Sequence, residues 1–332
     1  MRTLTISVAT LLVSVFPVTS WGAAKQAETT LNCRVYGFRA ETVYMDCNNN
    51  PAINAQFPAN QGEDMTMRFS ADRLTIITVN DTGILLEPGD SLCADFRFNS
   101  QSRRPESIEF SGSDRSVVEN EIFQSLEKYR LSMKYKEQLL SCVVLDIKPA
   151  ERLADSEKLM QRVRETLDRT KKKTSAAFRN YVSAYYETMY WLSKIEYPAM
   201  YAQLRKTPFD KQGIGDYWTI DRGLKLRKDD ASLSCFPYYE LILRYCTYCG
   251  ERNAMAAGET YVRPDELEAA YAELASFYKS NPQVRDAALY ALLGNYIRQG
   301  VQIERVDALL PDYLKNYNRN PLFAATLEAM MQ

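Results

Sequence analysis

Cys246 and Cys249 form a CxxC motif, the pattern in this chain with the clearest chemical potential. In thiol–disulfide exchange proteins the first cysteine of such a motif lies at a helix N-terminus, where backbone N–H groups and the helix dipole stabilise the thiolate. Here the motif follows a helix predicted from Pro237 to Tyr248, and the carbonyl groups of a helix C-terminus raise a thiol pKa. Arg244 and Arg252 would offset part of that field. Dithiol chemistry is therefore a hypothesis, and a structural role for both thiols is the favoured interpretation.

A second pair of cysteines, Cys33 and Cys47, suggests a structural disulfide. The two residues lie at symmetric positions about Ala40, in a short polar turn between two predicted strands. In a regular hairpin they would face each other at about the separation that a disulfide needs. The alternative is two small thiols buried in the sheet.

The chain contains no histidine, and this excludes several classes of site. Serine-hydrolase triads, Cys–His proteases and His-ligated zinc or haem all need an imidazole. Zinc held by cysteine alone is also a weak prediction, because the CxxC motif and Cys235 supply three thiolates at most. We therefore expect no metal ion and no cofactor, and we favour a protein that is not an enzyme.

Aromatic side chains are the remaining candidates for a ligand site. The chain has 22 tyrosines. Tyr185 and Tyr190 lie in a Tyr-rich helical stretch, and Trp218 lies in an irregular segment among several aspartates. Such side chains bind sugars or peptides, but at helical spacing they more often form a core face. The aspartates give no means of setting the carboxylate separation that a glycosidase needs.

The N-terminus has the layout of a secretory signal. Arg2 precedes an apolar run from Leu4 to Val18, and the small residues Ser20, Gly22, Ala23 and Ala24 follow. The run is too short for a stable membrane span, although an uncleaved anchor is the alternative. We expect cleavage of residues 1–24, no membrane span in the mature chain, and a soluble protein in the periplasm or outside the cell.

The predicted mature chain divides into a β-rich and a helical region. Residues 25–115 contain short strands separated by Gly, Pro, Asn and Asp, which indicates a small antiparallel sandwich or barrel. Residues 116–332 have helical periodicity, so the predicted fold class is α+β. Within the helical region we expect long helices to about residue 205, an irregular stretch over 207–234, and helical hairpins over 237–331.

Local signals predict helix boundaries in the last third of the chain. Pro264, Asn281-Pro282 and Asn320-Pro321 each place a proline or capping residue where a helix begins. Gly300 predicts the end of the helix that begins at Asn281-Pro282.

Several segments occur in a familiar order. In the β-rich region a strand pair leads to ILLEPGDSL at 84–92 and then to IEFSG at 108–112, and a helix with an early Asn120 follows. The helical region contains YYELILRY at 238–245, NPQVRD at 281–286 and LPDYL at 310–314. This order resembles the N-terminal accessory region of exported TlpA-type thioredoxin-like disulfide reductases, as built in Bacteroidetes. The resemblance implies a small β-domain and a helical region before a thioredoxin domain. The chain ends at Gln332, roughly where that domain would start, so the redox activity of the family is not carried over.

These observations predict an exported, non-catalytic binding or scaffold protein, related to that accessory region. The partner would be another cell-envelope protein or a second copy of the chain. Nucleic acid is not expected, because 41 Lys and Arg face 42 Asp and Glu. Two alternatives are a thiol–disulfide exchange protein that uses Cys246 and Cys249, and a ligand-binding protein that uses a Tyr- and Trp-rich helical face.

Overall fold

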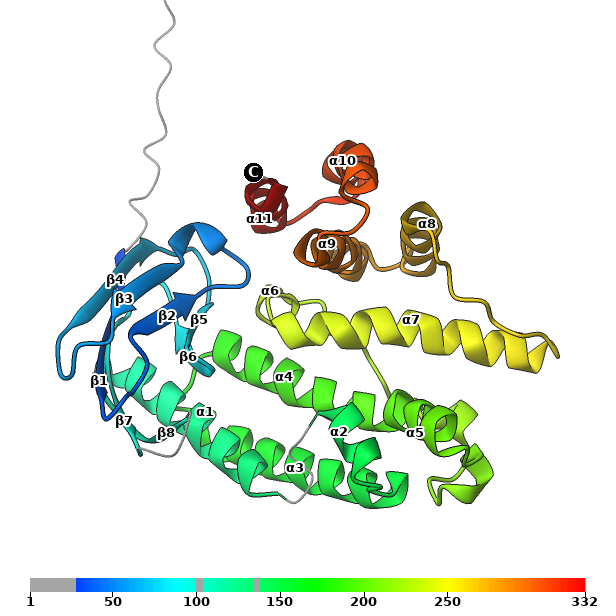
Figure 1. The fold of residues 1–332 in the computed structure, drawn as a ribbon, viewed down its shortest axis with the longest axis horizontal. Coiled ribbons are helices and arrows are strands. Elements are labelled where there is room, and N and C mark those ends of the chain that lie inside the picture. Colours follow the sequence, from blue (N-terminus) through cyan, green and yellow to red (C-terminus); the bar gives the residue numbers. More distant parts are fainter. Residues whose placement is uncertain (1–27, 100–103, 134–137, 332) are drawn as a thin grey trace, which may run out of the picture.

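The fold is a β-sandwich followed by a helical region (Figure 1). The computed structural model describes residues 28–99, 104–133 and 138–331. The predicted fold class, α+β with the small β-unit first, is confirmed. The predicted signal peptide at 1–24 lies outside the described residues.

Within the described residues, eight strands form two four-stranded sheets that share one core. The first sheet has the order β4-β1-β7-β8 and the second the order β3-β2-β5-β6. Strands β1 and β7 pair in parallel, and the other pairs among these described strands are antiparallel. The strands are β1 (Glu28–Tyr36), β2 (Thr42–Asp46), β3 (Ala55–Pro58), β4 (Met65–Ser70), β5 (Thr75–Val79), β6 (Thr82–Leu86), β7 (Ser91–Phe98) and β8 (Pro105–Gly112).

The hairpin predicted around Ala40 does not form. β1 pairs with β4 and β7, whereas β2 pairs with β3 and β5 of the other sheet. The chain crosses between sheets here because both strands have an apolar face, and the two faces cover one core from opposite sides. The register expected to bring Cys33 opposite Cys47 is therefore wrong. Both cysteines are buried, free thiols.

The helical region consists of rows of packed helices (Figure 1). In the picture α3, α4 and α7 lie one above another, and α8 to α11 form a further layer above α7. The helices are α1 (Asp114–Ser132), α2 (Leu139–Val144), α3 (Pro149–Thr170), α4 (Ala176–Ile195), α5 (Tyr197–Arg205), α6 (Asp230–Leu233), α7 (Phe236–Ala256), α8 (Leu267–Phe277), α9 (Pro282–Gln299), α10 (Ile303–Asp312) and α11 (Pro321–Met331).

The long helices expected before residue 205 end with α3, α4 and α5. A turn after Thr170 reverses the chain, so that α3 and α4 pack as a hairpin. Ser175 starts α4, because its hydroxyl accepts the N–H of Phe178 at 2.9 Å and caps the helix. Further along, the helix starts at Pro282 and Pro321 and the end at Gly300 are confirmed.

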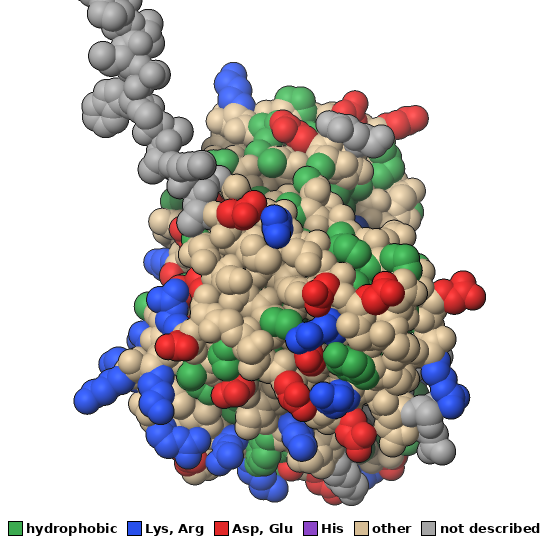
Figure 2. Space-filling view, turned by 90° about the vertical axis from the view of Figure 1, so that its left-hand side faces the viewer, with side chains coloured by type: hydrophobic (Ala, Val, Ile, Leu, Met, Phe, Trp, Pro, Cys, Tyr) green, Lys and Arg blue, Asp and Glu red, His purple; other side chains and the backbone are tan. Residues whose placement is uncertain are grey.

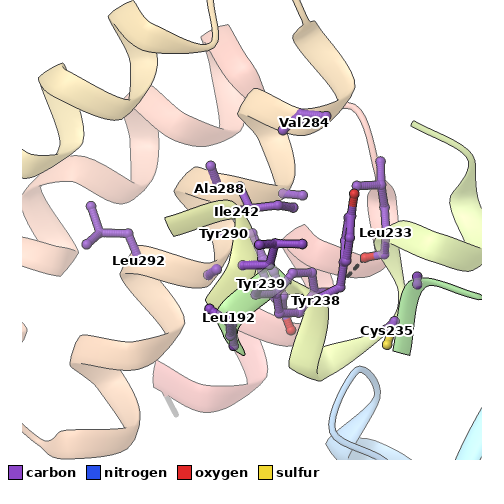
Figure 3. Close-up of a cluster of buried hydrophobic side chains, with 14 of the residues drawn as sticks. Leu192, Leu233, Cys235, Tyr238, Tyr239, Ile242, Val284, Ala288, Tyr290 and Leu292 are labelled. Atoms are coloured by element: carbon purple, nitrogen blue, oxygen red, sulfur yellow. Dashed lines mark hydrogen bonds between the residues drawn. The ribbon is translucent and has the colours of Figure 1, made fainter. Parts of the chain in front are cut away.

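The core of the helical region contains buried side chains of α3, α4, α7 and α9, and Figure 3 shows a part of it around α7 and α9. Tyrosine is a core residue here, and its hydroxyl bonds to backbone. Tyr239, for example, donates to the carbonyl of Leu233 at 2.8 Å. The residues labelled in the close-up are Leu192, Leu233, Cys235, Tyr238, Tyr239, Ile242, Val284, Ala288, Tyr290 and Leu292.

Helix α1 joins the two parts by covering the edge of strand β6. The buried side-chain amide of Asn120 accepts the N–H of Leu85 at 2.9 Å and donates to the carbonyl of Leu85 at 2.7 Å. Gln124, one turn later, donates to the carbonyl of Gly83 at 2.8 Å. Side chains of a helix thus satisfy backbone groups that another strand would otherwise bond.

A buried carboxyl lies next to this contact. Glu119 is 1% exposed and accepts the N–H of Ser175, at the start of α4, at 2.6 Å. Burial, and after it the charge of Glu87, raise the pKa of Glu119 to about 7, although the hydrogen bond from the N–H of Ser175 lowers it. Glu87 itself pairs with Arg115 at 2.7 Å.

We expect Asn120→Ala to lower the free energy of unfolding by about 2–4 kcal/mol, because it leaves a buried N–H and a buried C=O of Leu85 without partners. The control Gln124→Ala removes one half-buried hydrogen bond and should cost about 1 kcal/mol. Urea unfolding followed by circular dichroism measures both losses. Equal losses would show that the Asn120 contact does not hold α1 on the sandwich.

Glu119 gives stability a pH dependence. Its folded pKa of about 7 lies above the ordinary value of 4.5, so the folded state binds the proton more tightly. Its contribution is fully present below about pH 4.5 and is lost as the pH rises to about 7. Glu119→Gln should remove this loss, so the variant gains on the wild type between pH 4.5 and 8 by roughly 2–3 kcal/mol. Parallel curves of stability against pH for the wild type and Glu119→Gln would contradict this role of Glu119.

Candidate functional site

A cavity of about 990 Å³ lies where the sandwich meets the helical region. One wall is the outer face of β5 and the start of β6, and another is the first half of β8. Ile77 and Val79 of β5 face the sandwich core, so the alternate residues Ile76 and Thr78 face the helices. Helices α1 and α4 and the link from α6 to α7 complete the enclosure. The volume is at the upper end of that typical of ligand pockets.

Aromatic rings from two helices form one side of this cavity. Tyr181 and Tyr185 lie one turn apart on α4, with ring centroids 6.4 Å apart and planes nearly parallel. Phe123 of α1 meets Tyr185 edge-on at 5.6 Å. The i, i+4 spacing on α4 places both tyrosines on one face.

The ion pair between Glu127 and Arg130 lies beside the hydroxyl groups of Tyr185 and Tyr186. Arg130 donates to both oxygens of Glu127, with Nη2 2.7 Å and Nε 3.0 Å from the carboxylate. Tyr186 donates to Glu127 at 2.8 Å, and the hydroxyl of Tyr185 lies 3.5 Å from the other oxygen. Burial and the charge of Glu127 raise the pKa of Tyr185, so it stays a neutral hydrogen-bond donor.

The charges at the mouth of the cavity are unbalanced. Asp81, Glu106 and Glu121 are exposed and line the cavity, and none of them makes an ion pair within the described part of the chain. Lys128 and Arg104 are cations that also line the cavity, and Lys128 makes no ion pair to a described residue. Arg73, by contrast, pairs with Asp72 at 2.8 Å. The three acids outnumber Lys128 and Arg104, so the charge at the mouth is negative.

The three aromatic residues predicted to bind a ligand do not share one surface. Tyr185 lines the cavity. Tyr190 packs edge-on against Trp191 at 5.0 Å, under the ammonium group of Lys194. Trp218 packs against an aromatic group at the far end of α4, with Phe209, Tyr217 and Tyr248. These three residues thus do not form one continuous Tyr- and Trp-rich face.

The CxxC cysteines lie in the interior of α7. The helix continues to Ala256, so the end predicted at Tyr248 is wrong, and the motif is at neither terminus. Cys246 and Cys249 are 3% and 4% exposed. Burial raises the pKa of Cys246 to about 12 and raises that of Cys249 as well. This environment disfavours the thiolate that exchange chemistry needs.

Several residues of the cavity were not singled out from the sequence. Phe123, Glu127 and Arg130 carry no site motif beyond ordinary helical spacing. Nothing local predicts that α1, α4 and β5 line one cavity, because these elements are distant in sequence.

Comparisons with known proteins add no function to this geometry. The chain matches no family model, no curated protein and no solved structure. Within the described residues, no three Cys, Asp or Glu side chains are grouped so that they could hold a metal ion. No helix in that part of the chain combines the length and apolar character needed to cross a membrane.

We expect native-state alkylation with iodoacetamide near neutral pH to label Cys93 first, because it alone among the seven cysteines is not buried. Cys246 and Cys249 should react only after unfolding, as read by peptide mass spectrometry. Fast labelling of either one in the folded protein would restore the dithiol hypothesis.

Proposed function

We propose that this chain is a non-catalytic binding protein of the cell envelope, exported by its N-terminal signal and related to the accessory region of TlpA-type reductases. Its ligand occupies the cavity between the sandwich and the helices. The observation that carries the proposal is that cavity, about 990 Å³ in volume, with aromatic rings and neutral polar side chains in its walls. Pockets of this size and composition are the default binding sites of proteins.

The walls support binding because their main polar groups are already fixed. The Glu127–Arg130 pair and the hydroxyl of Tyr186 hold one another in place, and Tyr185 packs against Phe123. A ligand would meet a preorganised surface, so little side-chain entropy would be lost on binding. Since both parts of the molecule contribute walls, a bound ligand would also strengthen the junction between them.

A catalytic role has less support. The two thiols of the CxxC motif are buried in α7 with raised pKa values. They lie apart from the cavity, which is lined by Cys47 but by neither of them. The thiol–disulfide alternative therefore has no accessible thiolate to start the reaction.

The proposed partner is another molecule of the cell envelope. The alternative is a second copy of this chain. On the side of the molecule in Figure 2, Lys and Arg side chains are interspersed with Asp and Glu, and hydrophobic side chains are scattered between them. A mixed surface of this kind favours solubility over a broad apolar contact. The cavity is thus better suited than this face to carry affinity.

A thermal-shift screen of peptides, glycans, lipids and small metabolites tests the proposal on the full chain. A ligand at about 100 times its Kd should stabilise the wild type by about 3 kcal/mol and raise its Tm. Ser125→Trp, which fills the cavity from α1, should abolish that rise, whereas Glu304→Trp on α10 should keep it. If no ligand raises the Tm of the wild type more than that of Ser125→Trp, the cavity is not the binding site.

A further inference from the structure

Strand β8 is the edge of its sheet on the side of the cavity. Within the described residues it pairs with β7 alone, as the order β4-β1-β7-β8 requires. Ile108 and Phe110 of β8 line the cavity, and their side chains pack partly against the sandwich core. The cavity thus lies beside the part of the sheet where another strand could be added.

The register of β7 and β8 decides which backbone groups face that space. In an antiparallel ladder, pairs that exchange hydrogen bonds alternate with pairs that do not. The N–H of Ser113 bonds to the carbonyl of Ser91 at 2.8 Å and continues the register of the two strands. Residues of β8 an odd number of positions before Ser113 therefore direct N–H and C=O away from β7. Ile108 and Phe110 are two of them.

Two other edge strands are less suitable. Strand β6 is covered by α1, through the side chains of Asn120 and Gln124. Strand β3 ends in Pro58, which has no N–H to donate. Of these three edge strands, β8 combines outward backbone groups with a cavity that has aromatic rings on another side.

We propose that the cavity binds an extended, basic peptide segment, which pairs with the free edge of β8; this rests on the proposed binding function. An added strand would bond through the N–H and C=O of Ile108 and Phe110, and its alternate side chains would contact the sandwich or the aromatic rings. The basic character follows from charge complementarity. Asp81, Glu106 and Glu121 make no ion pair to a described residue, and they outnumber the cations Lys128 and Arg104 that also line the cavity.

The test uses the full chain and a short fluorescent peptide of alternating lysine and valine, with a glutamate–valine peptide of equal length as control. We expect the basic peptide to bind about tenfold more tightly in fluorescence anisotropy. On binding, hydrogen exchange at the amides of Ile108 and Phe110 should slow. Unchanged exchange at both amides, or equal binding of the two peptides, would overturn the inference.

Two variants at one position separate backbone pairing from side-chain contact. Ile108→Pro removes an outward N–H but leaves the ladder with β7, and should weaken binding about tenfold. Ile108→Ala shortens the side chain, keeps the N–H, and should bind within about twofold of the wild type. Equal weakening by the two variants would contradict strand addition. If the proline variant does not fold, the exchange measurement on the wild type decides.

The outcomes also distinguish this inference from the binding function. If neither peptide binds, but another ligand gives a thermal shift that Ser125→Trp abolishes, the cavity is a binding site and the peptide inference is wrong. If no ligand of any class gives such a shift, both proposals are wrong.

Discussion

The arrangement of this protein depends on how α1 covers the edge of β6. Asn120 bonds to both backbone groups of Leu85, as a neighbouring strand would, and is buried there. A misplaced α1 would leave these groups unpaired in an apolar environment, which costs more than the bonds themselves contribute. The contact therefore fixes the position of the helical region on the sandwich, and with it the walls of the cavity. Glu119, the preceding residue, extends the same junction to the start of α4.

The many tyrosines serve mainly to build the helical core. Buried hydroxyls donate to backbone carbonyls, and two of these, of Leu233 and Ile195, belong to the last residues of α6 and α4, where carbonyls lack partners within the helix. Tyr197 bonds to Ile147, Tyr217 to Ile195, Tyr248 to Tyr217 and Tyr278 to Ile242. Each ring thus fills space and also links two elements of the chain. Tyr181 and Tyr185 differ from these because their rings also reach the cavity.

The proposed site joins two features that would otherwise be separate. An edge strand exposes backbone groups that invite pairing, and proteins commonly block such edges. Here the edge strand β6 is blocked by α1, while the edge strand β8 borders the cavity. Pairing at β8 would be restricted to segments that fit between the sheet and α1. That restriction gives specificity without a catalytic group.

The sequence by itself determined the kinds of element and many of their boundaries. Alternation of apolar residues indicated the strands, and helical periodicity indicated the helices. Proline and glycine signals predicted the start and end of α9 and the start of α11. These features are local, since they depend on backbone preferences within a few residues. The absence of histidine likewise excluded whole classes of site before any fold was known.

Only the tertiary structure decided which elements are neighbours. Cys33 and Cys47 appear symmetric about a turn, yet the chain passes from one sheet to the other between them, because a sandwich core needs apolar faces from both sheets. The turn after Thr170 depends on the packing of α3 against α4. The cavity brings Tyr185, Phe123 and Ile108 together through such long-range contacts, which no local pattern encodes.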